Sequence, residues 1–306
     1  MAYTYTGARN LYGDLTKDSS STNLTLGDKL IIAGVRKIHG LKDWPFLYKE
    51  RTLTSIASTQ DYPFPYDTEK PLGVTVTVSS IIYHPIEVTS FAAWQKLNEQ
   101  SSTYESNITQ YWFAYNDRVS LYPISDTTAQ TITIHSKLIV KDNSVADYTT
   151  GKIAAVTNGD GTVTGASAGD APVWTTKMAG RYMRITDTDT AATGDGLWYE
   201  IASITSATVL ELTRLYGGLT FTAATAAYTI GQWLQLPENY HTLPIYYAAY
   251  VYWSLQKDER ANLFKGMYDE GVKAMISDYT NPTGTLSIDE DPDDGLNSNL
   301  FQRLGT

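Results

Sequence analysis

The sequence predicts an α+β fold in which an N-terminal helix and a C-terminal helical hairpin form a core packed with antiparallel strands. This core carries an inserted small all-β, barrel-like lobe. Apolar residues recur at helical spacing toward both ends, alternate with polar residues between residues 51 and 140, and form short runs in a Thr-, Ala- and Gly-rich stretch. We expect a discontinuous core domain (1–143 and 234–280), an inserted lobe (144–233) and a flexible acidic tail with an apolar tip (281–306).

The composition is that of a folded chain without cysteine chemistry. Of its 306 residues, 42% are hydrophobic and 12% are aromatic, enough for one large core or two of ordinary size. No cysteine is present, which excludes disulfides, thiolate nucleophiles and cysteine zinc sites. The net charge of −10 argues against a protein that grips nucleic acid by neutralising phosphates. We expect no membrane association, because the longest apolar stretch, Pro244 to Leu255, is too short to span a bilayer.

The first helix is predicted over Thr22 to Leu41, where leucine, isoleucine and valine recur near helical spacing. Thr25 or Asp28 is the expected cap for its exposed amides. The segment Trp44 to Tyr48 follows, with large apolar groups beside Pro45, which cannot continue a helix. Core packing explains this segment best, and an anchor of the helix end on a sheet is the alternative.

Antiparallel strands are predicted from Arg51 to Val140, where apolar residues alternate with polar ones. A short helix over Ser90 to Asn98 interrupts them, with Phe91, Trp94 and Leu97 on one face. The strand residues are Leu53, Ser55 and Ala57; Val74, Val76 and Val78; Trp112 and Ala114; Val119 and Leu121; Ile132 and Ile134.

The inserted lobe is predicted from six short β runs between turn pairs such as Asn158-Gly159 and Gly217-Gly218. Residues 139–141 are typical of the end of one element and residues 233–236 of the start of the next. The lobe is therefore predicted to be inserted into a domain that is otherwise continuous. The runs are Lys152–Val156, Thr162–Gly165, Tyr182–Thr186, Trp198–Ile204, Val209–Arg214 and Tyr228–Ile230.

A helical hairpin is predicted after Pro237, with one helix over Leu243 to Gln256 and a second from Asp258 to about Tyr279. The first helix is aromatic nearly all round, so we expect it to be covered on more than one side, by its own sheet or by a neighbouring subunit. Core packing alone explains it equally well. The candidate subunit-interface residues are Tyr246, Tyr250 and Trp253.

The tail combines acidic and apolar residues. The last twenty residues hold five acidic side chains and one arginine, a net −4 of the chain's −10. Leu300, Phe301 and Leu304 interrupt this polar pattern, so docking of the tail tip on a partner is one interpretation and a frayed end is the other.

No motif indicates catalysis or a bound cofactor. The four histidines are not spaced as ligands of one metal, and no nucleophile elbow, phosphate loop or dinucleotide fingerprint is present. A glycosidase carboxylate pair is spatial and leaves no spacing signal. We expect no enzyme activity, no catalytic residue, no metal and no cofactor.

The order of elements resembles the head-to-tail adaptor proteins of tailed bacteriophages. The resemblance is carried by weak, core-shaping motifs: Asn23 to Leu30 running to Lys42 to Leu47, Tyr62 to Asp67 before Gly73 to Val78, Tyr83 to Val88 leading into the helix with Trp94, Trp112 to Asp117 leading to Leu121-Tyr122-Pro123, and Leu236 to His241 opening the hairpin. The insert, with Met178 to Tyr182 and Gly196 to Thr205, is similar to β-barrel lobes of related virion proteins.

The resemblance implies a structural virion protein of the phage neck, assembled in the host cytoplasm. Identical subunits would form a ring, usually dodecameric, beneath the portal, which extends the channel for double-stranded DNA without binding it specifically. The expected partners are the chain itself, the portal protein and a tail, nozzle or tail-tube protein. In such adaptors the C-terminal segment commonly reaches the portal, which makes Leu300, Phe301 and Leu304 the candidate docking residues, and the β lobe points outward.

A carbohydrate- or receptor-binding virion protein is the alternative. In that case Trp174, Trp198 and Tyr199 of the inserted lobe would stack on sugar rings, although aromatic residues in a β lobe more often belong to its core.

Overall fold

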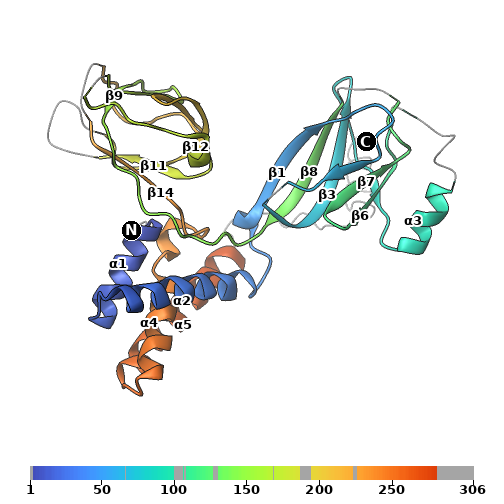
Figure 1. The fold of residues 1–306 in the computed structure, drawn as a ribbon. Coiled ribbons are helices and arrows are strands. Elements are labelled where there is room, and N and C mark those ends of the chain that lie inside the picture. The colour runs from blue at the N-terminus through green and yellow to red at the C-terminus, as the bar shows by residue number, and fades with distance from the viewer. Residues whose placement is uncertain are drawn as a thin grey trace, which may run out of the picture.

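The computed structural model is a mixed α+β chain with mainly antiparallel sheets, arranged as three lobes that meet at one junction (Figure 1). A helical lobe forms the base, and a β sandwich and a smaller β module project from it. The structure describes residues 3–65, 67–99, 106, 108–126, 130–167, 169–186, 194–222 and 226–280.

The helical lobe joins segments from both sides of the β lobes. Its four helices are α1 (Tyr5–Thr16), α2 (Ser21–His39), α4 (Leu243–Leu255) and α5 (Arg260–Thr280). The sequence predicts three of them within two residues at each end and misses α1. The side chain of Ser20, rather than the expected Thr25 or Asp28, caps α2 by accepting a hydrogen bond from the Asn23 N–H at 3.3 Å.

Helix α4 is the centre of this lobe and is covered by α1, α2 and α5. Close crossings depend on glycine: a Cβ on Gly34 of α2 would lie 3.0 Å from the Pro244 Cα, and one on Gly27 would lie 2.3 Å from the Tyr12 ring of α1. The cover predicted for this aromatic helix is therefore supplied by other helices of the same chain.

The turn after α2 packs on the end of α5. The short helix η1 (Pro45–Leu47) follows α2. Its Leu47 and the preceding Trp44 are buried in a core shared with α5, and the centroid of the Trp44 ring lies 6.0 Å from that of Tyr279. The indole N–H of Trp44 donates to the Ile38 carbonyl at 2.8 Å. The segment therefore packs in the core, and it holds the end of α2 against α5 rather than against a sheet.

The β sandwich consists of two four-stranded sheets, ordered β1-β8-β3-β4 and β2-β7-β6-β5, with antiparallel pairing except between β5 and β6. Its inner faces bury a core that includes Trp112, Val119 and Ile132. Helix α3 (Phe91–Asn98) covers an outer face through Trp94. The strands are β1 (Tyr48–Thr54), β2 (Asp61–Pro63), β3 (Thr68–Val78), β4 (Ile81–Tyr83), β5 (Ile86–Glu87), β6 (Tyr111–Tyr115), β7 (Arg118–Tyr122) and β8 (Thr131–Leu138).

This separate core corrects one part of the predicted fold class. We expected the strands between residues 51 and 140 to pack with the helices into a single core. In the structure, the buried residues of the two sheets and those of the helices form distinct clusters. The reason is that the strands supply enough apolar side chains to close a sandwich by themselves.

The inserted module is a six-stranded antiparallel sheet in the order β14-β11-β12-β13-β10-β9. It curves around its own core, and bridges from Ile153 to Ala226 and from Val156 to Phe221 tie the β9 edge to the segment before β14. The strands are β9 (Ile153–Val156), β10 (Thr162–Gly165), β11 (Tyr182–Ile185), β12 (Trp198–Ser206), β13 (Val209–Leu212) and β14 (Tyr228–Gly231).

The two connections to this module run side by side, as an insertion requires. The Asn143 side chain donates to the Trp233 carbonyl at 3.1 Å, and the Gln232 side chain accepts from the Ser144 N–H at 2.7 Å. Thr4 bridges to Trp233, and its hydroxyl donates to Asp147 at 2.6 Å. The segment before α1 thus closes the base of the module.

Candidate functional site

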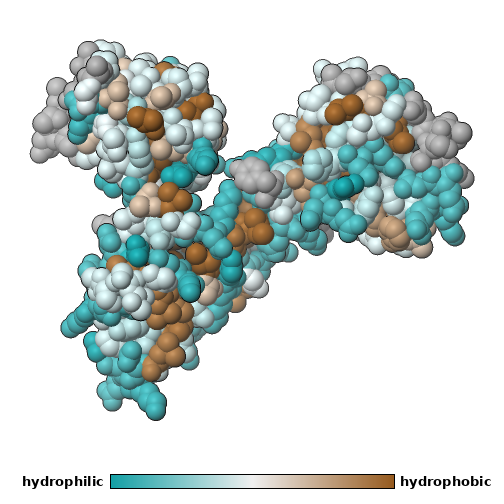
Figure 2. Space-filling view, viewed as in Figure 1, coloured by the Kyte–Doolittle hydropathy of each residue, from teal (hydrophilic) through white to brown (hydrophobic). Residues whose placement is uncertain are grey.

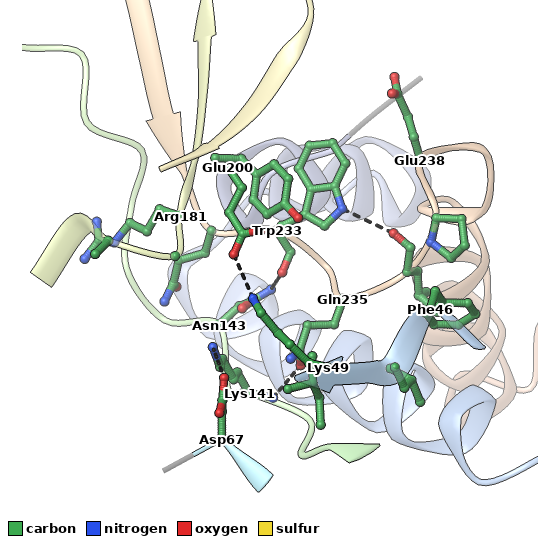
Figure 3. A pocket seen from close by; sticks show the side chains of 18 of the residues that line it. Phe46, Lys49, Asp67, Lys141, Asn143, Arg181, Glu200, Trp233, Gln235 and Glu238 are labelled. Carbon is green, nitrogen blue, oxygen red and sulfur yellow. Dashed lines mark hydrogen bonds and ion pairs between the residues drawn. The ribbon is translucent and has the colours of Figure 1, made fainter. Parts of the chain in front are cut away.

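A cleft of about 940 Å³ lies where the three lobes meet (Figure 3). Its walls come from the start of β1 and from the two connections to the inserted module. The short helix η3 (Thr176–Met178) and the start of β11 complete them. Ligand sites commonly form at such junctions between folded units. The lining side chains used below are Phe46, Lys49, Asp67, Lys141, Lys177, Arg181, Tyr182, Glu200, Trp233, Glu238 and Tyr279.

Two carboxylates on the cleft wall, Glu200 and Asp67, form ion pairs. The Lys49 Nζ of β1 lies 3.1 Å from the Glu200 Oε1 of β12, so the pair joins the sandwich to the inserted module. Asp67 is only 1% exposed and contacts Arg51 at 2.5 Å and Lys141 at 3.8 Å. Burial, and secondarily the Glu200 charge, raise the pKa of Tyr182 to about 12, so its phenol stays protonated.

Two further cations have no such partner. Lys177 is exposed and Arg181 is half-buried on the module wall, and neither forms an ion pair with another residue that the structure describes. Desolvation lowers the pKa of the Arg181 guanidinium, which remains charged at neutral pH. In Figure 3 Arg181 lies at one edge of the cleft and Glu238 at another.

Trp233 joins the module to the helical lobe beside this cleft. Its ring stacks on Tyr182 at 4.4 Å between centroids and meets the His241 ring edge-on at 4.4 Å. His241 is fully buried, where its Nδ1 accepts from the Tyr3 N–H at 3.0 Å and its Nε2 lies 2.8 Å from the Leu236 carbonyl oxygen. Burial lowers the pKa of His241 to about 4, so the ring is neutral at physiological pH.

The predicted subunit-interface residues have different surroundings. Trp253 is 7% exposed, its indole N–H donates to the Leu15 carbonyl at 3.3 Å and the Arg260 guanidinium lies 3.4 Å from its ring centroid. It therefore packs largely inside its own chain, and its place at a subunit seam stays a prediction. Tyr246 and Tyr250 are half-buried on the same helix. The predicted docking residues Leu300, Phe301 and Leu304 lie outside the described residues.

Two apolar surface patches were not predicted from the sequence. We call them the hairpin patch (Ile81, Ile82, Ile86 and Phe91) and the helix patch (Leu255, Leu263 and Met267). The hairpin patch residues are 54% to 65% exposed and lie on the edge strands β4 and β5 and at the start of α3. In the helix patch, Leu263 and Met267 share one face of α5. Figure 2 shows apolar surface on every lobe, with a band along the helical one.

The sequence signal for these patches was ambiguous. Ile81 and Ile82 are consecutive, so strand alternation assigns only one of them to a core, yet both are more than half exposed. Leu263 and Met267 have helical spacing that is normally typical of a buried face. The cleft had no sequence signal, because its walls come from segments as far apart as Phe46 and Tyr279.

The aromatic residues proposed for sugar stacking do not form an open platform. Trp174 and Tyr199 are each 3% exposed, and the Trp174 N–H donates to the Tyr228 hydroxyl at 2.9 Å. Trp198 is half-buried against Trp233. Trp174 and Tyr199 therefore belong to the core of the inserted module, as the sequence analysis considered.

Within the described residues, no group of three or more His, Asp or Glu side chains is placed to hold a metal ion. In that same part of the chain, no helix combines the length and apolar character needed to cross a bilayer.

No protein-family model matches this chain. A search of curated proteins found no matching sequence.

Proposed function

We propose that this chain is a head-to-tail adaptor of a tailed bacteriophage. Identical copies form a ring beneath the portal protein, extend the DNA channel and present an attachment surface to the tail. The observation that carries the proposal is the set of large apolar side chains left exposed on two different lobes, in the hairpin patch and in the helix patch. Figure 1 shows α3 of the sandwich and the turn between α4 and α5 at the outer ends of their lobes. Large exposed apolar side chains gathered in this way are typical of assembly surfaces.

The two patches favour a ring over a two-fold dimer. A two-fold dimer uses the same self-complementary patch twice, whereas a head-to-tail contact joins two different patches and closes into a ring when the rotation permits. The hairpin patch comes mainly from the edge strands β4 and β5, whereas the helix patch comes from the end of α4 and one face of α5, so the two differ in origin. Unpaired backbone groups on β4 add a means of pairing with a neighbouring segment.

The charge of the chain agrees with a DNA channel. A protein that conducts DNA must release it, and a net charge of −10 disfavours tight phosphate contacts. The sugar-binding alternative receives less support, because two of its three aromatic rings are buried.

Ring formation provides the test. We expect the purified chain to form rings, alone or on the portal encoded by the same genome, in mass measurement and negative-stain images. Ile82→Lys in the hairpin patch and Leu263→Lys in the helix patch should each abolish the rings. Leu215→Lys is the matched control, because Leu215 is 65% exposed on the inserted module, outside both patches. A wild-type chain that stays monomeric with and without portal contradicts the proposal.

A further inference from the structure

The chain leaves the helical lobe at the wall of the junction cleft. Helix α5 ends at Thr280, and its penultimate residue, Tyr279, lines the cleft. The Lys42 Nζ donates to the Tyr279 carbonyl at 3.3 Å, which fixes this exit point. The described part of the chain therefore ends beside the cleft.

The cleft offers positive charge on an otherwise acidic chain. Its lining contains four basic side chains (Lys49, Lys141, Lys177 and Arg181) against three acidic ones (Asp67, Glu200 and Glu238). Glu200 and Asp67 already pair with Lys49 and Lys141. Lys177 and Arg181 thus remain available for an anionic partner, and partial burial strengthens any ion pair that Arg181 forms.

The tail contains the complementary charge. The run Asp289 to Asp294 holds five carboxylates in six residues. Eight residues separate it from Thr280. Extended, they span up to about 28 Å, more than twice the roughly 12 Å diameter of a sphere with the volume of the cleft. The run can therefore reach Lys177 and Arg181 of its own chain.

We propose that the acidic run Asp289 to Asp294 binds in the junction cleft of its own chain, with its carboxylates on Lys177 and Arg181. Because the tail begins on α5 and these two cations belong to the inserted module, the contact ties the module to the helical lobe. A tethered segment has a high effective concentration, so contacts too weak for a free peptide suffice here. The proposal concerns the isolated chain and does not depend on ring formation.

The absence of cysteine allows a direct distance measurement in the full-length chain. Spin labels are attached at Thr176→Cys, on the cleft wall, and at Ser287→Cys, beside the acidic run. Pulsed electron resonance then gives the distance between them at a concentration where the protein is monomeric. We expect a dominant population of distances below about 30 Å at low salt, which is lost at 1 M salt because charges there are screened within about 3 Å.

Charge variants identify the binding site. Lys177→Gln with Arg181→Gln should remove the short-distance population. Lys265→Gln with Lys273→Gln removes the same charge from exposed positions on α5 outside the cleft and should leave it unchanged. Circular dichroism confirms that each variant is folded.

Two results would overturn the inference. One is a distance distribution that is the same in all variants and at all salt concentrations. The other is a short distance that appears only when singly labelled chains are mixed, since the cleft would then hold the tail of another copy. The two proposals can fail separately. If the short distance is found but no ring forms with portal, the tail contact stands and the adaptor proposal is contradicted.

Discussion

Acidification should weaken the base of the helical lobe through His241. The Tyr3 N–H donates to its Nδ1, so the proton of the neutral ring is on Nε2, which faces the Leu236 carbonyl. Protonation would turn Nδ1 into a second donor pointing at the Tyr3 N–H and place a charge in a fully buried site. The segment before α1 should therefore detach as His241 becomes charged.

The magnitude follows from the pKa. Burial lowers the His241 pKa from 6.5 to about 4, so the unfolded chain binds this proton more readily than the folded one. Stability is unaffected well above pH 6.5, falls as the pH drops through 6.5 and is lowest below pH 4. At about 1.4 kcal/mol per pKa unit, the full loss is about 3 kcal/mol, of which about 2 kcal/mol appears by pH 5.

Urea unfolding of the helical lobe between pH 7.5 and pH 5 measures this loss. His241→Asn is the comparison, because its amide keeps both a donor and an acceptor without titrating. The wild type should lose about 2 kcal/mol more than the variant over this range, while all other titrating groups contribute equally to both. Parallel pH profiles, or a His241 pKa above 6 by nuclear magnetic resonance, would refute the reasoning.

Two further stability predictions concern helix crossings and a buried carboxylate. Gly27→Ala should destabilise the chain by about 1–3 kcal/mol, because its Cβ would lie 2.3 Å from the buried Tyr12 ring, whereas Gly266→Ala, with nothing within 4 Å, should stabilise it by up to about 1 kcal/mol. Thermal melting of both variants checks this, and equal effects would contradict the packing argument. Asp67→Asn should cost about 1–3 kcal/mol, because it leaves the facing cations without their carboxylate in a site that is 1% exposed. Asp142→Asn, at a pair with side chains 58% and 66% exposed, should change the unfolding free energy by less than about 1 kcal/mol, and similar losses in both variants would show that burial is not decisive.

Local patterning predicted most of the secondary structure. The bounds of all six strands of the inserted module agree with the structure to within two residues, because each is short, alternating and bounded by turn residues. Gly159, in one of these turns, has a φ of +79°, which glycine adopts at little cost. Helix α1 was missed although Ala8, Tyr12 and Leu15 recur near helical spacing, because Gly7 and Gly13 weaken its helical pattern. Its position depends on the space that Gly27 leaves for Tyr12.

Tertiary arrangement was much harder to predict. Alternation shows that a strand has one buried face but not which sheet it joins, so the sandwich was assigned to the helical core. A helix that is aromatic all round does not reveal which neighbours cover it, and only the structure shows that α1, α2 and α5 pack on α4. The cleft depends on segments that meet only after three lobes have formed, and no local pattern describes such a meeting.

The position of both β lobes between the two pairs of helices affects how the chain can fold. Helices α2 and α4 pack together although roughly 200 residues separate them, so the helical lobe cannot be completed until α4 and α5 have been synthesised. By then both β lobes can already be folded, since each has its own core. Closing the helical lobe then constrains only short connections, which lowers the loop-closure cost by about 2 kcal/mol relative to an unfolded loop of that length. The β lobes would thus act as folded spacers that bring the two helix pairs together.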